Sequence, residues 1–305
     1  MGINRQSRLS SPLAIPGYIL APNGGKVFYV CSLGIQDDTT ADLAGSLSTT
    51  WNAALAQCRA NRGDVVQILP GHVETVVGTD ILSNQVAGVR TVGIGFGTER
   101  PTFTFTGATD QFLLNDANCS YENLIFKNGS SNTTLAWDVT AAGVRFHNCY
   151  VQASDASNKL TSVMRLSSGA NDFVMEDTDI IGGSTALTDT FLTNAAVARV
   201  RLERCYMAAA LGVAEGLVTM ATAAPTRMRI YDCTFENTVA SSTVALKGIA
   251  AATGTIRDVR LGITVADGAG VGVAGFNTKG NFNIYNVTTS SIGLGQVASV
   301  AATTA

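Results

Sequence analysis

Apolar and polar residues alternate along most of this chain, and the alternation comes in an eight-residue pattern that recurs. The pattern reads apolar, any, apolar, any, Asn or Asp, small, any, apolar, and its clearest copy is VRFHNCYV at residues 144–151. Further copies begin at residues 119, 173, 200, 228, 256 and 282, so successive starts lie 25, 29, 27, 28, 28 and 26 residues apart. A drifting period of this length indicates a solenoid, in which each repeat forms one coil and is buried by its neighbours.

The spacing inside the pattern identifies the kind of solenoid. Apolar residues at every second place predict strands, whereas a helical repeat would need apolar spacings of three and four. Asn or Asp at the fifth place tolerates the left-handed conformation and can turn the chain. The sixth place points inward again and predicts one stacked column, formed in chain order by Leu124, Cys149, Thr178, Cys205, Cys233, Leu261 and Val287. The sequence therefore predicts an all-β, single-stranded parallel β-helix of about eight or nine coils, roughly 40 Å long.

Changes in the pattern divide the chain into four segments. In order, they are an extended N-terminal arm (1–24), an initial strand with a short capping helix (25–64), the β-helix (65–289) and a C-terminal cap or arm (290–305). The arm contains three prolines and no period, so we expect it to be ordered by docking on another subunit. The capping helix is expected near 48–58, where Ser or Thr can cap its first turn. The last segment is small and uncharged, and some cover is needed there because an open β-helix end exposes unpaired strand edges.

The start of the β-helix resembles a known family. The run DDT…WxxAL…GDVVxILPGxxE between residues 37 and 74 is similar to the beginning of right-handed parallel β-helix proteins of the pectate-lyase-like superfamily. In those proteins a short helix covers the open end of the first coil, and an LPxG-like turn follows the first strand. The superfamily includes polysaccharide lyases, hydrolases, phage tailspikes and non-enzymatic virion proteins, so the resemblance implies a fold and leaves the activity open. The chain most resembles the non-enzymatic bacteriophage proteins that decorate or cement a capsid.

Composition and charge narrow the class of protein further. Only 14% of the residues are charged and the net charge is −3, which suggests that much of the surface lies against other protein and argues against nucleic acid as the main partner. No segment reads as a signal peptide or a membrane span, so we expect synthesis in a host cytoplasm and no membrane partner. The six cysteines have no close pair in sequence, and we expect them to be reduced core residues. Cys205 and Cys233 would lie one coil apart, so a disulfide between them stays open.

Candidate chemistry lies on two outward columns, at the second and fourth places of the pattern. The second place is rich in Arg and the fourth in Glu; the columns read Arg90, Ser120, Arg145, Val174, Arg201, Arg229, Arg257, Asn283 and Glu122, His147, Glu176, Glu203, Tyr231, Val259, Tyr285. Glu176 and Glu203, with Arg201, are the candidates for a catalytic site, since glycoside hydrolysis needs two carboxylates roughly 5–10 Å apart. The competing interpretation is a ladder of surface ion pairs, because an adjacent Arg lowers the pKa of a carboxylate and makes it a poor general acid. We favour the ladder and expect no catalytic residue.

No metal or cofactor is expected. The two histidines, His72 and His147, are far apart in sequence, and no aspartates have the spacing of a calcium loop. Asp177 and Asp179 are two residues apart, but Asp177 takes the turn place of its copy.

Two functions compete on these grounds. We expect a structural bacteriophage virion protein, not an enzyme, that decorates or cements the capsid as a homotrimer, with the major capsid protein or other virion proteins as partners. The alternative is a tailspike or tail-fibre module that binds or cleaves bacterial surface polysaccharide. The candidate interface residues are Arg5, Arg8, Pro12, Pro16, Tyr18, Arg145, Arg201, Arg229 and Arg257.

Overall fold

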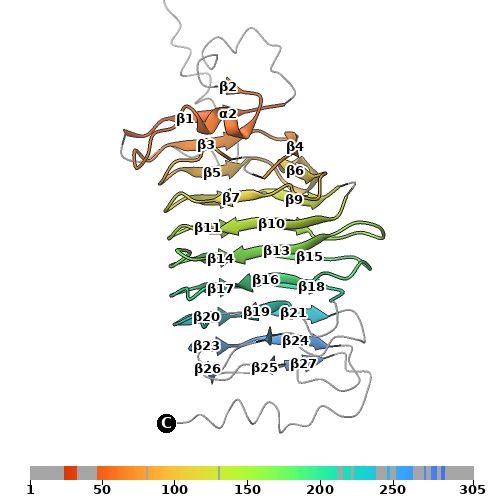
Figure 1. Ribbon diagram of the computed structural model, residues 1–305. Helices are drawn as coiled ribbons and strands as arrows, with labels where there is room; N and C mark the ends of the chain where they lie inside the picture. Colours follow the sequence, from red (N-terminus) through yellow and green to blue (C-terminus); the bar gives the residue numbers. More distant parts are fainter. Residues whose placement is uncertain are drawn as a thin grey trace, which may run out of the picture.

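The chain winds into a stack of coils along one axis (Figure 1). The computed structural model describes residues 24–32, 47–79, 82–129, 131–211, 216–220, 223–237, 246–247, 252–263, 271–272, 276–279 and 283–285. The predicted terminal segments, including the interface candidates Arg5, Arg8, Pro12, Pro16 and Tyr18, lie outside these ranges.

Three parallel sheets form the sides of the stack. Sheet A has 11 strands, in spatial order β2 (Leu47–Ser48), β1 (Val27–Val30), β3 (Val65–Ile68), β5 (Arg90–Gly93), β8 (Ser120–Glu122), β11 (Arg145–His147), β14 (Val174–Glu176), β17 (Arg201–Glu203), β20 (Met228–Tyr231), β23 (Gly254–Arg257) and β26 (Phe276–Lys279). Sheet B has 9 strands, β27 (Asn283–Tyr285), β24 (Arg260–Ile263), β21 (Thr234–Asn237), β18 (Tyr206–Ala209), β15 (Asp179–Ile181), β12 (Tyr150–Gln152), β9 (Ile125–Asn128), β6 (Thr102–Phe105) and β4 (Val73–Val76). Sheet C has 7 strands, β25 (Val271–Gly272), β22 (Leu246–Lys247), β19 (Val218–Met220), β16 (Asp189–Thr193), β13 (Leu160–Leu166), β10 (Thr133–Val139) and β7 (Phe112–Leu114). The predicted all-β parallel β-helix is confirmed, although the coils that cross sheet C are slightly fewer than the eight or nine expected.

Each eight-residue pattern spans two strands, not the single strand expected. In the clearest copy, β11 of sheet A ends at His147, β12 of sheet B begins at Tyr150, and Asn148 turns the chain between them. Residues at this corner all have positive φ: Asn123 (58°), Asn148 (51°), Asp177 (49°), Arg204 (51°), Asp232 (51°) and Asp258 (55°). The predicted turning role of the fifth place is therefore confirmed, and in one coil an arginine performs it.

The register corrects the placement of the last two copies. Ile230 pairs with Ile256, so Arg257 stands beside Tyr231 in the fourth column and not in the second column with Arg229. The copy that begins at residue 282 forms β27 in sheet B, whereas the preceding copies begin in sheet A. Because strand side chains repeat every two residues, the two-place shift of the copy at residue 256 leaves its apolar pattern intact and cannot be detected from it.

The inward column forms a dry core. Cys149, Cys205 and Cys233 are 3%, 2% and 0% exposed, and all six cysteines of the chain are free. Burial raises the pKa of Cys149 to about 11, so its thiol stays protonated at neutral pH. Val259 is the buried residue that follows Cys233 in this column, in place of the predicted Leu261, which pairs with Phe235.

A short helix covers the first coils, as the sequence predicts. Helix α2 (Trp51–Leu55) is capped by Thr50, whose Oγ1 accepts a hydrogen bond from the backbone N–H of Ala53 at 3.3 Å. Trp51 is buried, and its ring lies 4.9 Å from Phe103. A turn of 3-10 helix, η3 (Gly97–Glu99), lies between β5 and β6.

Candidate functional site

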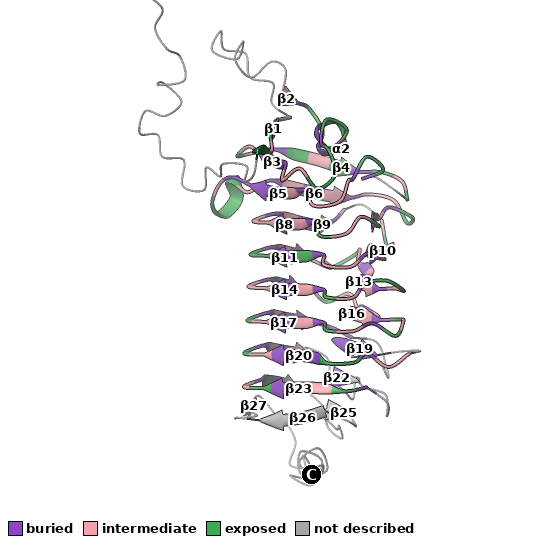
Figure 2. Cartoon of the chain, turned by 90° about the vertical axis from the view of Figure 1, so that its left-hand side faces the viewer, coloured by how far each residue is buried: buried purple, intermediate pink, exposed green. Residues whose placement is uncertain are grey.

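The outward columns of sheet A lie on the face formed by β8, β11, β14, β17 and β20. Buried and exposed residues take the same places in successive strands of this face (Figure 2). One row of the register joins Arg90, Ser120, Arg145, Val174, Arg201 and Arg229, and the row two residues on joins Val92, Glu122, His147, Glu176, Glu203, Tyr231 and Arg257. The face therefore presents an arginine column beside a carboxylate column.

The candidate catalytic carboxylates are held by arginines. Arg201 Nε donates to Glu203 at 2.6 Å, and its Nη2 lies 2.6 Å from Glu176 Oε1, so one guanidinium bridges two adjacent coils. Arg204 Nη1 also donates to Glu203. The structure thus brings Glu176, Glu203 and Arg201 together, and it adds Arg204, which the sequence analysis did not single out.

A second group of charges lies next to Glu203, at the corner between sheets A and B. Arg204 makes a bidentate contact with Asp177, at 2.7 and 2.8 Å, and His147 lies 3.3 Å from Asp177 and 3.6 Å from Glu122. The hydrogen bonds from Arg204 hold the pKa of Asp177 below its usual value. Asp177 therefore stays ionised at neutral pH and is suited to an ion pair and not to general acid catalysis.

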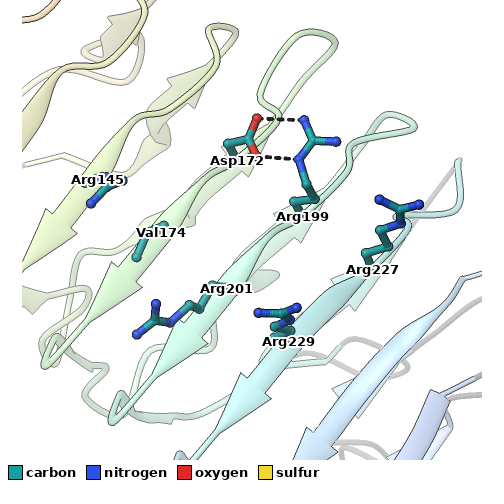
Figure 3. Close-up of a pocket in the computed structure, with 7 residues that line it drawn as sticks. All are labelled: Arg145, Asp172, Val174, Arg199, Arg201, Arg227 and Arg229. Carbon is teal, nitrogen blue, oxygen red and sulfur yellow. Dashed lines mark hydrogen bonds and ion pairs between the residues drawn. The ribbon is translucent and has the colours of Figure 1, made fainter.

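An arginine-lined pocket of about 320 Å³ lies on the same face (Figure 3). Its lining residues come from four successive coils: Arg145, Asp172, Val174, Arg199, Arg201, Arg227 and Arg229. Five of the seven are arginines and one is an aspartate. The site is therefore strongly cationic, although the whole chain carries a net charge of −3.

The arginines of this pocket differ in whether their side chains have a hydrogen-bond or ion-pair partner. Arg199 Nη2 donates to Asp172 at 2.7 Å, and Arg201 is held by the two glutamates of the neighbouring column. Arg145, Arg227 and Arg229 are exposed and have no side-chain hydrogen bond or ion pair within the described part of the chain. Their guanidinium groups are free to bind an anion.

A second column of residues, whose backbones adopt the left-handed conformation, positions part of the pocket. In six successive coils the residue just before the eight-residue pattern has positive φ, and in chain order these residues are Gly88, Asn118, Gly143, Asp172, Arg199 and Arg227. Gly adopts this conformation without steric cost, and Asn and Asp adopt it more readily than other residues. Arg199 (φ 60°) and Arg227 (φ 57°) depart from that preference, and both line the pocket.

The predicted interface residues are only partly brought together. Arg145, Arg201 and Arg229 lie in the pocket, whereas Arg257 lies outside it, with its guanidinium 4.7 Å from the centre of the Tyr231 ring. The sequence analysis missed Asp172, Arg199 and Arg227, since it did not include the place before the pattern. The sequence did contain a signal for this column, because the residue before the pattern is Gly, Asn or Asp in four other coils, at Gly88, Asn118, Gly143 and Asp172.

The described residues contain neither a metal-binding cluster nor a membrane-spanning helix. No group of three or more metal-binding side chains is found among the described residues. In the same residues, no helix is both long and apolar enough to cross a membrane.

Comparison with known proteins identifies the fold. No family model and no curated protein matches the sequence. Two solved structures are similar: the pectin methylesterase from carrot, at 14% identity and a TM-score of 0.50 over 87% of this chain and 83% of that one, and the deglycosylated pectin methylesterase from Aspergillus niger, at 12% identity and a TM-score of 0.46 over 91% and 89%. The likeness to the carrot structure shows the fold alone, a right-handed parallel β-helix.

This comparison corrects one prediction and leaves another as a proposal. The expectation that the chain is not an enzyme is contradicted, because the similar structures are esterases by name, and that expectation is withdrawn. Neither structure is a virion protein, so the virion role is not carried by the comparison. What the chain shares with these proteins is the right-handed parallel β-helix fold.

Proposed function

We propose that the chain is a structural protein of a bacteriophage virion, which decorates or cements the capsid as a β-helical homo-oligomer. The observation that carries the proposal is the small number of charges on an elongated stack of coils. Charged residues make up 14% of the chain, whereas about 25% is typical of soluble domains. A rod has more surface to solvate than a globule of equal length, so fewer charges favour faces that other chains cover.

Two further observations support an assembly role. All six cysteines are free and buried, which suits synthesis in a reducing host cytoplasm. The guanidinium of Arg201 contacts the carboxylates of both Glu176 and Glu203. This link between adjacent coils stiffens the sheet A face. The partners that fit such a role are further copies of the chain, as a trimer, and the major capsid protein.

Fractionation of particles tests the proposal. Particles of the phage that encodes the chain would be banded by density and examined by mass spectrometry and by immunogold electron microscopy. We expect the chain in DNA-filled particles, with gold on the capsid, and a trimer by light scattering of the purified protein. A chain confined to the soluble fraction, or gold confined to the tail, would overturn the proposal.

A second candidate is a module that binds or cleaves bacterial surface polysaccharide. The observation that favours it is the pair Glu176 and Glu203 on adjacent coils of a fold that pectin methylesterases also use. Two carboxylates so placed are a requirement of glycoside hydrolysis. The arginine between them could also neutralise the carboxylate of an acidic sugar.

The Glu203→Gln variant tests this second function. The purified protein would be incubated with free and methyl-esterified polyuronates and with bacterial capsular polysaccharide, and methanol, reducing ends and unsaturated products measured. If Glu203 is catalytic, turnover falls by about a hundredfold or more in Glu203→Gln. The matched control is Glu99→Gln, which alters an exposed glutamate on η3 outside the site. Absence of product from every substrate, or equal turnover in both variants, contradicts the cleaving form of this function.

A further inference from the structure

Three of the five arginines in the pocket have no acidic partner among the described residues. Asp172 is the one acidic residue among the lining residues, and it is engaged by Arg199. Arg145, Arg227 and Arg229 point their guanidinium groups over the same face from two coils, that of β11 and that of β20 (Figure 3). Like charges gathered in this way repel one another, so the cluster is most stable when an anion is bound among them.

The backbone beneath the pocket gives an independent observation. Arg227 has a φ of 57° at a place where Gly88 and Gly143 stand in other coils. An L-residue in the left-handed region is strained, and Arg lacks the short polar side chain that lets Asn or Asp adopt it. Arg227 forms no ion pair with the described residues, whereas Arg199 pairs with Asp172. A strained residue whose side chain has no partner among the described residues points to a function for that side chain.

The shape and chemistry of the pocket define the ligand. Guanidinium groups bind carboxylates through paired hydrogen bonds. The lining contains no aromatic ring on which a sugar or a base could stack, and its apolar contact comes from Val174. The adjacent column carries Glu176 and Glu203, which would repel a wide polyanion. These features favour a narrow ligand with separated carboxylates over a polysaccharide or a nucleic acid.

An extended peptide meets these requirements. Side chains four residues apart on one edge of an extended strand lie about 13 Å apart, close to the roughly 14 Å of the three coil steps that separate Arg145 from Arg229 in the register. Two acidic side chains on one edge of such a peptide can therefore reach arginines of different coils, such as Arg229 and Arg145. Backbone groups of the peptide would remain available to water above the shallow pocket.

We propose that this pocket is the docking site for an extended acidic segment of a partner protein, whose Asp or Glu carboxylates are bound by Arg145, Arg227 and Arg229. The identity of the partner as a virion protein rests on the function proposed above, whereas the carboxylate-binding role of the pocket does not.

Binding of a defined probe tests the inference. A fluorescent peptide of four Glu-Ser repeats would be titrated with the purified chain, with the Gln-Ser peptide as the neutral control. We expect the acidic peptide to bind, the neutral one to bind at least tenfold more weakly, and Arg229→Glu to weaken binding at least tenfold. The matched control is Arg260→Glu, which reverses the charge of an exposed arginine on β24, outside the pocket.

Three results would overturn the inference. They are failure of the acidic peptide to bind, equal weakening by Arg229→Glu and Arg260→Glu, and tighter binding of a polyuronate or of single-stranded DNA in the same assay. If the peptide binds as expected but the chain is absent from particles, the virion role fails and the pocket assignment stands. If the chain decorates particles but no peptide binds, the pocket assignment alone fails.

The strain at Arg227 offers a second measurement. Because Asn tolerates the left-handed conformation, Arg227→Asn is expected to unfold at the same temperature as the wild type or at a higher one, while it weakens peptide binding at least threefold. A residue placed there only for folding would give the opposite result, a lower unfolding temperature with unchanged binding.

Discussion

The side chain of Asp64 organises the turn that leads into the first coil. Asp64 is 1% exposed, and it accepts hydrogen bonds from the backbone N–H groups of Lys26 at 2.8 Å and Arg59 at 2.7 Å and from the guanidinium of Arg62 at 2.6 Å. Burial raises the pKa of Asp64, but the hydrogen bonds from Arg62, Lys26 and Arg59 outweigh it and hold the pKa below the usual value. The ionised form is therefore the one that the fold requires.

Replacement of this carboxylate is expected to be costly. Asp64→Asn removes the charge that Arg62 needs and turns an NH2 donor toward other donors, so we expect a loss of about 2–4 kcal/mol in the free energy of unfolding at pH 7. Because the folded pKa lies below the unfolded value of about 3.9, this contribution is present at neutral pH and is lost as the pH falls through the folded value. Urea unfolding at pH 7 and near pH 3 measures both effects.

An exposed pair provides the control for Asp64. Asp172 and Arg199 form a bidentate contact on the surface, so Asp172→Asn should cost about 0–1 kcal/mol under the same conditions. Similar losses in the two variants would contradict the role assigned to Asp64.

At the scale of the element, the corner between sheets A and B combines a backbone requirement with side-chain hydrogen bonds. Asn123 has a φ of 58°, and its Nδ2 donates to the carbonyl oxygens of Gly93 at 2.7 Å and Gly95 at 3.0 Å. Its Oδ1 accepts a hydrogen bond from Asn148 of the next coil at 3.1 Å. One side chain therefore links three coils while its backbone turns the strand.

Two substitutions separate these contributions. Asn123→Gly keeps the left-handed backbone and loses the hydrogen bonds, for an expected cost of about 1–2 kcal/mol. Asn123→Ala loses the hydrogen bonds and adds the steric cost of positive φ, so it should be less stable than the Gly variant by about 1 kcal/mol. Denaturant unfolding of both proteins gives the difference directly. Equal stabilities would show that the corner does not depend on backbone conformation.

The same corner shows how far the sequence could predict the elements. Alternation and the fifth-place Asn or Asp predict the coils and the left-handed turn, because both are local properties of the chain. Arg204 could not be predicted there, since arginine has no preference for positive φ and only the shared corner geometry places it in that conformation. The register of Ile256 could not be predicted either, because coils of different length shift the strand by two residues without changing its buried face.

The candidate site depends on the turn geometry and the strand register, which the sequence pattern does not supply. Arg201 beside Glu203 is a contact within one strand, so the ion pair could be inferred from spacing alone. The pocket requires Arg199 and Arg227 to lie beside the second-place column, and their position follows from the turn before each strand. The sequence therefore identified three of the arginines of the pocket and could not assemble them with the other two.

At the scale of the whole molecule, the core changes along the stack. Each coil of a solenoid contacts its neighbours, so local stability follows local packing. The aromatic contacts among the described residues join side chains between Trp51 and Phe191, such as Phe126 and Trp137 with ring centres 4.6 Å apart. Beyond them Phe235 is the one buried aromatic residue among those described, and the rest of the apolar core is aliphatic, Met or Cys, including Met207, Cys205 and Cys233. Since aromatic pairs add about 0.5–1.5 kcal/mol beyond burial, the first coils are expected to be the more stable ones.

Amide hydrogen exchange measured by mass spectrometry tests this gradient. Strands β8 to β13 should be protected longest, and exchange should quicken from β20 toward β24, because opening propagates from the less tightly packed end. Phe235→Ala, in the weaker part, should accelerate exchange in β20 to β24 and leave β8 to β13 unchanged. Trp137→Ala should instead shorten protection in the aromatic coils, with a loss of about 3–5 kcal/mol for a fully buried ring. Uniform exchange in the wild type, or the same response to both variants, would mean that the coils unfold as one cooperative unit.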